Sequence, residues 1–230
     1  MLRPLAPAIT ALMMGLTAGA LRAQSRTVDE GELEVRVGGQ LVGREVFTIR
    51  EVPGSQGRPR LRLTVTAWYP PRAGTATLQP TLDLDEDSLP RTLQIEETGE
   101  RPRRYFVSFG DQRVTVRVVS STGEAAREYP AGRRFLVADD SALALFAVLP
   151  STRPGTVQLF QPRTGRRGTA TLDPQGTEMT SVKGVRRELR HYVVVRDEGP
   201  THLWFDAEGR LVRIGIPSRS LTAERTALPR

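Results

Sequence analysis

Cysteine is absent from this chain of 230 residues, and its absence excludes several kinds of chemistry at once. The protein has no disulfide, no thiolate nucleophile, no cysteine-ligated zinc site and no lipid anchor attached to a cysteine. An oxidising compartment permits disulfides without requiring them. A mature chain of about two hundred residues is also long enough to bury a core without such cross-links.

Aromatic residues make up only 6% of the chain, which argues against a groove that stacks sugar rings. Lysine is almost missing, since Lys183 is the one exception among 33 basic residues, and the formal net charge is +7. The arginines are interleaved with aspartate and glutamate and form no basic run, so they are typical of a solvated surface. We therefore expect no nucleic-acid partner.

The N-terminal segment has the three parts of a secretory signal. Arg3 supplies a positive charge, residues 8–21 form an apolar run, and small residues at Ala20 or Ala23 suit a signal peptidase. This pattern predicts a cleaved signal peptide over residues 1–23 and a periplasmic or secreted protein; the alternative is a buried N-terminal helix. No later run approaches 18 apolar residues, so we expect no transmembrane segment in the mature chain.

Alternation of apolar and polar residues dominates the rest of the chain and predicts strands. Leu33, Val35 and Val37 alternate with charged residues before Gly38-Gly39, a two-residue hairpin turn. The predicted strands are 33–37, 42–52, 61–68, 75–84, 92–96, 104–109, 112–119, 156–160, 168–172, 177–182, 187–195, 202–206 and 210–216.

Residues 142–149 are the one segment with a helical pattern. Asp139-Asp140-Ser141 offers N-cap side chains before it, and Pro150 follows it. The segment is apolar on all sides, so it must be covered by other elements. Two interpretations stay open, a lid or floor of a cavity and simple filling of the core.

The pattern predicts a single mainly β domain over residues 24–217, followed by a loosely ordered tail over residues 218–230. Many antiparallel strands have to close on themselves or pack in two layers, because open edges promote aggregation. We expect a strongly curved antiparallel sheet, a barrel or half-barrel, with one short apolar helix. The alternative is a β-sandwich.

The residues with reactive side chains form no complete catalytic or metal site. His191 and His202 lie on strands that a hairpin through residues 198–200 would pair, but two imidazoles lack a third metal ligand. The acidic residues Asp83, Asp85, Glu86 and Asp87 lack the spacing and the glycine of a calcium-binding EF-hand loop. They are interpreted as a strand end or turn that pairs with arginine. No G-x-S-x-G or Walker motif occurs. We therefore predict no catalytic residue, no metal and no cofactor.

Two stretches carry a family resemblance. Residues 31–43 (GELEVRVGGQLVG) resemble the opening hairpin of uncharacterised periplasmic β-proteins of the DUF3108 group. Residues 192–195 (YVVV) and 202–214 (HLWFDAEGRLVRI) are similar to the closing strands of that group. The broader likeness is to the half-barrel of lipoprotein carriers, in which a curved sheet wraps helices. The resemblance implies an apolar concave face and supplies no catalytic residue.

These observations lead to a hypothesis of a non-catalytic, exported carrier for a hydrophobic, lipid-like ligand. The predicted contact residues are Trp68, Leu143, Phe146 and Trp204, with arginines at the rim for an anionic headgroup. The alternative is a sealed barrel that serves as an interaction or envelope-maintenance module and binds an envelope protein. An enzyme comes third, because no residue pattern supports one.

Overall fold

The structure, a computed structural model, describes residues 25–54, 58–70, 77–132 and 134–228. These residues form one sheet of fifteen strands in the spatial order β8-β7-β6-β5-β4-β3-β2-β1-β15-β14-β13-β12-β11-β10-β9. The predicted mainly β class is confirmed, and the β-sandwich alternative is wrong because all the strands belong to one sheet. The predicted signal peptide, residues 1–23, lies outside the described residues.

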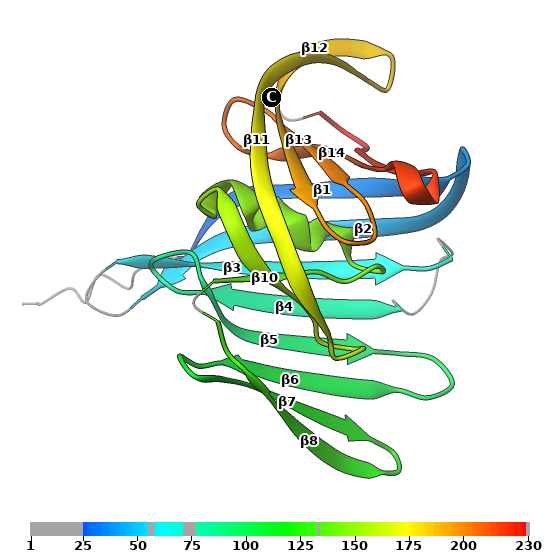
Figure 1. Ribbon diagram of the computed structural model, residues 1–230. Helices are drawn as coiled ribbons and strands as arrows, with labels where there is room; N and C mark the ends of the chain where they lie inside the picture. The colour runs from blue at the N-terminus through cyan, green and yellow to red at the C-terminus, as the bar shows by residue number, and fades with distance from the viewer. Residues whose placement is uncertain (1–24, 55–57, 71–76, 133, 229–230) are drawn as a thin grey trace, which may run out of the picture.

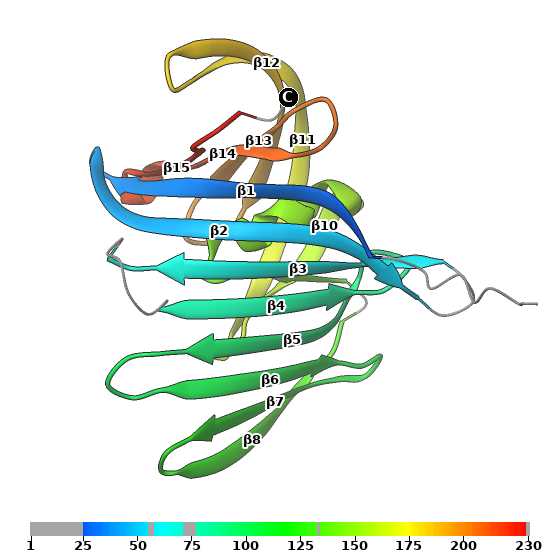
Figure 2. The ribbon, with the colours of Figure 1, turned by 180° about the vertical axis from the view of Figure 1, so that it is seen from behind.

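The first eight strands form an antiparallel meander (Figures 1 and 2). They are β1 (Arg26–Val37), β2 (Gln40–Pro53), β3 (Pro59–Trp68), β4 (Leu78–Leu84), β5 (Pro90–Glu97), β6 (Arg103–Phe109), β7 (Arg113–Ser120) and β8 (Gly123–Pro130). Gly38 and Gly39 both have positive φ, 55° and 83°, in the predicted hairpin turn between β1 and β2. Glycine reaches this backbone region without steric cost.

We call the β1–β8 meander the first wall of the sheet. The remaining strands curl back across this wall and rejoin it through β15, which lies between β14 and β1. They are β9 (Phe135–Val137), β10 (Gly155–Gln161), β11 (Arg166–Val182), β12 (Val185–Val195), β13 (Thr201–Phe205), β14 (Leu211–Ile216) and β15 (Leu221–Arg225). A three-residue 3-10 turn, η3 (Pro217–Arg219), precedes β15. The two end strands, β8 and β9, do not pair with each other, so the sheet is barrel-like without being closed.

The predicted helix is present as a 3-10 helix, η2 (Leu143–Ser151), inside the curve of the sheet. It packs against β2, β3 and β14. Residues 143–149 are all buried, as expected of a segment that is apolar on all sides. Pro150 lies within the helix instead of ending it. We call the sheet face that packs on this core the inner face.

Several strand predictions need correction. The loosely ordered tail predicted over residues 218–230 is wrong in part, because Leu221–Arg225 forms β15 and pairs with both β1 and β14. Its alternation is short, and one inward residue is the buried Arg225, which hides the strand pattern. The strands β8 and β9 were not predicted. The two strands predicted over 168–172 and 177–182 are one strand, β11, irregular between Pro174 and Gly176.

A smaller apolar cluster lies apart from the main core. Val182, Leu189 and Val212 are buried there, and Trp204 and Leu228 pack against them. Because Leu203 and Phe205 belong to the main core, Trp204 between them points to the opposite, outer face of the sheet. Within the described residues no helix is long and apolar enough to cross a membrane.

Candidate functional site

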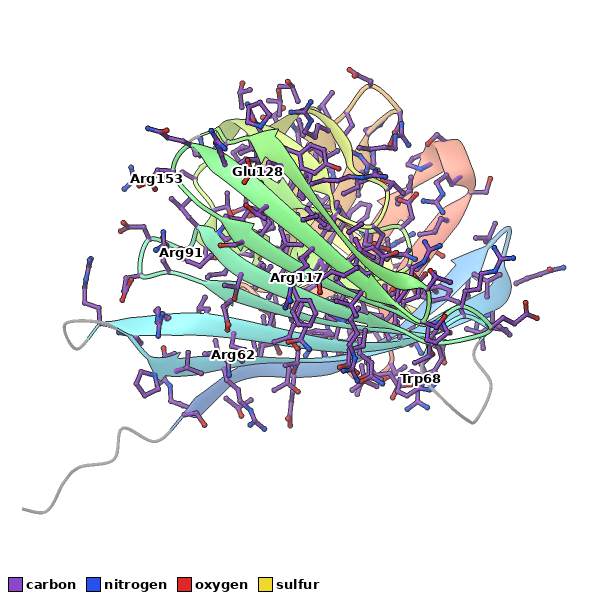
Figure 3. The ribbon with its side chains drawn as sticks, turned by 90° about the horizontal axis from the view of Figure 1, so that it is seen from below. Arg62, Trp68, Arg91, Arg117, Glu128 and Arg153 are labelled. Atoms are coloured by element: carbon purple, nitrogen blue, oxygen red, sulfur yellow. The ribbon has the colours of Figure 1, made fainter. Side chains whose placement is uncertain are left out.

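The structure does not bring the four predicted ligand residues onto one surface. Leu143 and Phe146 lie in the main core on η2, with 1% and 2% of their surfaces exposed. Trp68 alternates with the buried Ala67 and therefore lies on the outer face at the end of β3, where Arg44 stacks over its ring at 5.4 Å. Figure 3 shows Trp68 at the end of the sheet. Trp204 also lies on the outer face, but on another strand, β13.

The predicted proximity of the two histidines is confirmed. His191 on β12 faces Trp204 on β13 in the ladder, and His191 Nε2 lies 3.0 Å from His202 Nδ1. The ring of His191 stacks on Trp204 with a centroid distance of 4.8 Å, and Trp204 Nε1 donates to Glu178 at 2.5 Å. Burial lowers the pKa of His191. The described residues contain no group of three histidine, aspartate or glutamate side chains placed to hold a metal ion.

A buried carboxylate that was not predicted from the sequence caps the start of η2. Glu45 on β2 has no exposed surface, and its two oxygens accept hydrogen bonds from the backbone N–H groups of Leu143 at 2.9 Å and Ala144 at 2.7 Å. The Tyr69 hydroxyl donates to the same carboxylate. Burial raises the pKa of Glu45. The predicted cap residues, 139–141, do not cap the helix, because no side-chain cap bond forms at its N-cap, Ala142.

The signal for Glu45 was present in the alternation. Glu45 shares a strand face with Phe47 and Ile49, which are buried, so the period of two placed a carboxylate among core residues. A charged residue at an inward position has to find partners, because an unpaired buried charge costs several kcal/mol, of order ~3–5. The partners come from a segment about a hundred positions away, which no local pattern reveals.

A second polar cluster extends from the segment before η2 toward the open side of the sheet. Arg163, in the turn between β10 and β11, makes two hydrogen bonds of 2.7 Å to Asp139 and one of 2.8 Å to Glu97 on β5. The Tyr105 hydroxyl donates to Glu97 at 3.1 Å. These contacts hold the β10–β11 turn against β5. No backbone ladder joins β5 to β10 or β11 in the described sheet.

An open hollow of about 490 Å³, lined by both apolar and charged residues, lies at the other end of η2, and we call it the helix-end hollow. Its lining comes from β1, β2, β3, η2, β12 and the β13–β14 turn. The residues are Val28, Asp29, Ile49, Leu61, Ala147, Val148, Pro150, Ser151, Arg190, Glu208, Gly209 and Arg210. The β1–β2 ladder is irregular between Thr27 and Asp29, and Val28 at this irregularity is 44% exposed. The floor of the hollow is the last turn of the helix.

Charged groups border the helix-end hollow. Asp29 is buried and pairs with the buried Arg225 of β15 at 2.6 Å, and Arg225 also donates to the carbonyl oxygens of Leu211 and Glu30. Gly31 leaves room for this guanidinium, since a Cβ there would lie 2.5 Å from Arg225 Nε. Arg190 donates to the Asp206 carbonyl at 3.1 Å and forms no ion pair within the described chain.

Two further depressions lie on the sheet. A trough of about 740 Å³ crosses the outer face of β3–β7, where Arg62 pairs with Asp83 at 2.6 Å and Arg117 stacks over Phe106 at 4.6 Å (Figure 3). The predicted pairing with arginine is therefore confirmed for Asp83, at the strand end, whereas Asp85 accepts hydrogen bonds from the backbone N–H groups of Asp87 and Leu89 in the turn. Because these charged groups already have partners, the trough has the character of a solvated face. A groove of about 390 Å³ lies beside β8.

Comparisons with known proteins bear on the fold alone. No family model matches the chain, so the resemblance to the DUF3108 group has no support there, and no curated protein matches. Among solved structures the chain is similar to the crystal structure of a beta-barrel-like protein of the domain of unknown function DUF1849 from Brucella abortus. The identity is 10%, the match covers 86% of this chain and 94% of that chain, and the TM-score is 0.51.

Proposed function

We propose that the protein is an exported, non-catalytic carrier that holds one hydrophobic, lipid-like molecule in the helix-end hollow. The observation that carries this proposal is a hollow of about 490 Å³ in which apolar side chains of η2 and the neighbouring strands lie beside charged ones. Ligand sites typically start at about 300 Å³ and combine apolar walls with a few polar groups. Buried apolar surface contributes about 25 cal/mol per Å², so part of one acyl chain gives reversible binding.

The contact surface in this proposal is the last turn of η2 and not its first. Ala147, Val148 and Pro150 line the hollow, whereas Leu143 and Phe146 support the helix from within the core. The helix then serves as the floor of a binding site, which is one of the two roles left open for it by the sequence.

An anionic headgroup suits the rim of the hollow. Arg190 lines it and has no carboxylate partner in the described chain, so its guanidinium is available to a carboxylate or phosphate. Arginine binds such groups with paired, charge-assisted hydrogen bonds. The carrier would act in the periplasm or outside the cell, after removal of residues 1–23.

A passive role fits the side chains around the hollow. The chain has two histidines, and both lie on the outer face near Trp204 and do not line the hollow. The Ser151 hydroxyl, which does line it, donates to the Val148 carbonyl at 2.5 Å. Neither arrangement places a general base beside a nucleophile.

The sealed interaction module is the second candidate. The observation that favours it is the extent of the core, in which the seven residues 143–149 fill the inside of the sheet with at most 8% of any residue exposed. In that case the hollow is only a surface depression at the end of a packed core.

Native mass spectrometry of the mature protein with palmitate distinguishes the two candidates. Val28 and Val37 are exposed residues of the same strand, with 44% and 38% of their surfaces accessible, and only Val28 lines the hollow. Val28→Trp fills the hollow from its rim, and Val37→Trp is the matched control. We expect a one-to-one palmitate adduct in the wild type and in Val37→Trp, and its loss in Val28→Trp.

A wild-type protein that takes up neither palmitate nor phospholipid would sink the carrier proposal and leave the sealed module. An adduct that persists in Val28→Trp would also contradict the assignment of the hollow. Equal melting temperatures of the two variants would show that the tryptophan acts by filling the hollow and not by unfolding the domain.

A further inference from the structure

The two ends of the sheet differ in how their backbone edges are covered. β9 has three residues, all buried, and β10 pairs with it in parallel. β8 has eight residues, pairs with β7 without any irregularity, and has no strand on its other side in the described chain. Figures 1 and 2 show β8 as the last strand of its wall. A long regular edge is a template for another strand.

Strand alternation sorts the charges of β8 onto opposite faces. Glu128 faces Thr115 and Glu124 faces Val119 in the ladder, on the outer face, where Arg113 and Arg117 of β7 pair with the two carboxylates. Arg127 faces the buried Val116 and therefore lies on the inner face. Charged side chains often protect an edge strand from pairing with another strand. On β8 these charges are neutralised by arginines on the outer face, and those on the inner face are only cationic.

The groove beside β8 continues this cationic inner face. Its apolar part includes Tyr105, Val118 and Ala125, which are cross-strand neighbours, and its cationic part includes Arg103 and Arg127. Arg103 interacts with the Tyr105 hydroxyl and lies opposite Glu97 in the β5–β6 ladder, and neither Arg103 nor Arg127 lies within ion-pair distance of a carboxylate in the described chain.

Two other charged residues that line the groove already have partners. Arg163 is bound to Asp139 and Glu97, and Glu124 lies 3.5 Å from Arg117. The uncompensated charge of the groove is therefore positive.

Tyr129 closes one end of the groove. Its ring packs on Phe160 of β10 with a centroid distance of 5.4 Å, and Arg167 of β11 stacks over it at 5.2 Å. A Cβ at Gly165, in the β10–β11 turn, would lie 2.5 Å from the Tyr129 hydroxyl, so the turn meets this end of β8. The groove runs from this contact to the β7–β8 turn at Gly123.

We propose that this groove binds an extended acidic peptide segment of a partner protein, which adds as a strand to the free edge of β8. Backbone hydrogen bonds to the edge give affinity, and side chains at alternate positions give specificity. Acidic side chains on the inner side of the peptide meet Arg127 of β8, and small apolar ones rest on Ala125 of the same strand. Arg103, on β6, adds positive charge further along the same inner face. The site is separate from the helix-end hollow and does not depend on the carrier proposal.

Fluorescence anisotropy with a labelled hexapeptide of alternating valine and glutamate tests the proposal on the mature protein. We expect binding of this peptide, no binding of the valine–lysine analogue, and loss when alternate peptide amides on one edge are N-methylated. Arg127→Glu should weaken binding by about tenfold or more, since it reverses a charge in the contact. Arg91→Glu, an exposed arginine of β5 outside the groove, is the control and should change it by less than about twofold.

Equal binding by wild type and Arg127→Glu, or by the methylated and unmethylated peptides, would overturn the proposal. Absence of peptide binding together with palmitate binding that Arg127→Glu abolishes would assign the groove to an anionic amphiphile instead. Because Arg127 is exposed, the variant is expected to fold, and its circular dichroism and melting temperature check this.

Discussion

The two ends of η2 differ in how their polar groups and their surface are used. At the first turn, the N–H groups of Leu143 and Ala144 and the hydroxyl of Tyr69 all bind the carboxylate of Glu45. At the last turn, Ala147 and Val148 line an open hollow. One end is therefore anchored in a buried polar cluster, whereas the other lies beside an open hollow, with Ala147 and Val148 only 3% and 8% exposed.

This difference explains how a short 3-10 helix can be held in place beside an open hollow. Such helices have weaker hydrogen-bond geometry than α-helices and rarely extend beyond a few residues. The carboxylate of Glu45 fixes the helix to β2 in addition to the apolar contacts that bury residues 143–149. The helix is therefore held at its first turn by polar contacts that its other end lacks.

Removal of the Glu45 carboxylate should cause the largest loss of stability and so test the difference between the two ends of η2 most directly. Glu45→Ala leaves two buried N–H groups and the Tyr69 hydroxyl without their acceptor, and we expect it to lower the free energy of unfolding by about 4 kcal/mol. Glu32→Ala is the control, because Glu32 forms an exposed pair with Arg44 at 2.7 Å and should cost about 0.5 kcal/mol. Urea denaturation measures both. Similar losses in the two variants would show that Glu45 does not anchor the helix.

Truncation of apolar side chains at the two ends of the helix tests the same difference, with a smaller expected loss of stability. Leu143→Ala removes side-chain atoms from a site that is 1% exposed and should cost about 3 kcal/mol, because the core relaxes little around the cavity. Val148→Ala, at a site that is 8% exposed beside the hollow, should cost about 1 kcal/mol. The same denaturation assay compares them, with m-values checked for equality. A larger cost at Val148 would place the helix-end hollow inside the tightly packed core.

Much of the sheet could be predicted from local patterns. The alternation at Leu33, Val35 and Val37 and the turn at Gly38-Gly39 are confirmed as β1 and its hairpin. The His191–His202 contact followed from the hairpin alone. These features depend on residues close in the chain, so local sequence patterns are sufficient to predict them.

The features that define the candidate site depend on distant partners and were not predicted. Glu45 caps a helix that lies about a hundred positions away, and Arg225 is buried because Asp29, near the start of the chain, pairs with it. A strand such as β15, with one buried arginine, then lacks an apolar pattern. Trp68 and Trp204 were expected inside because they are large, but each occupies an outward strand position.

The pH dependence of stability gives the smallest and most specific test of the anchored end. Burial raises the pKa of Glu45, so the folded state binds its proton more readily than the unfolded state does. This contribution is fully present below the ordinary glutamate pKa of about 4.3 and is lost as pH rises through the higher folded-state pKa. Glu45→Gln removes the titration and retains an oxygen that accepts hydrogen bonds.

Other groups contribute their own slopes, which the comparison of wild type with Glu45→Gln cancels. Burial also raises the pKa of Asp29, at the open end, and lowers that of His191, whose contribution is instead lost as pH falls. Both residues are present in the wild type and in the variant. We therefore expect the difference between their unfolding free energies, measured from pH 4 upward, to shift against the wild type as pH rises. A constant difference across that range would mean that Glu45 ionises alike in the folded and unfolded states. The anchored end of η2 would then be no less accessible to water than the open end.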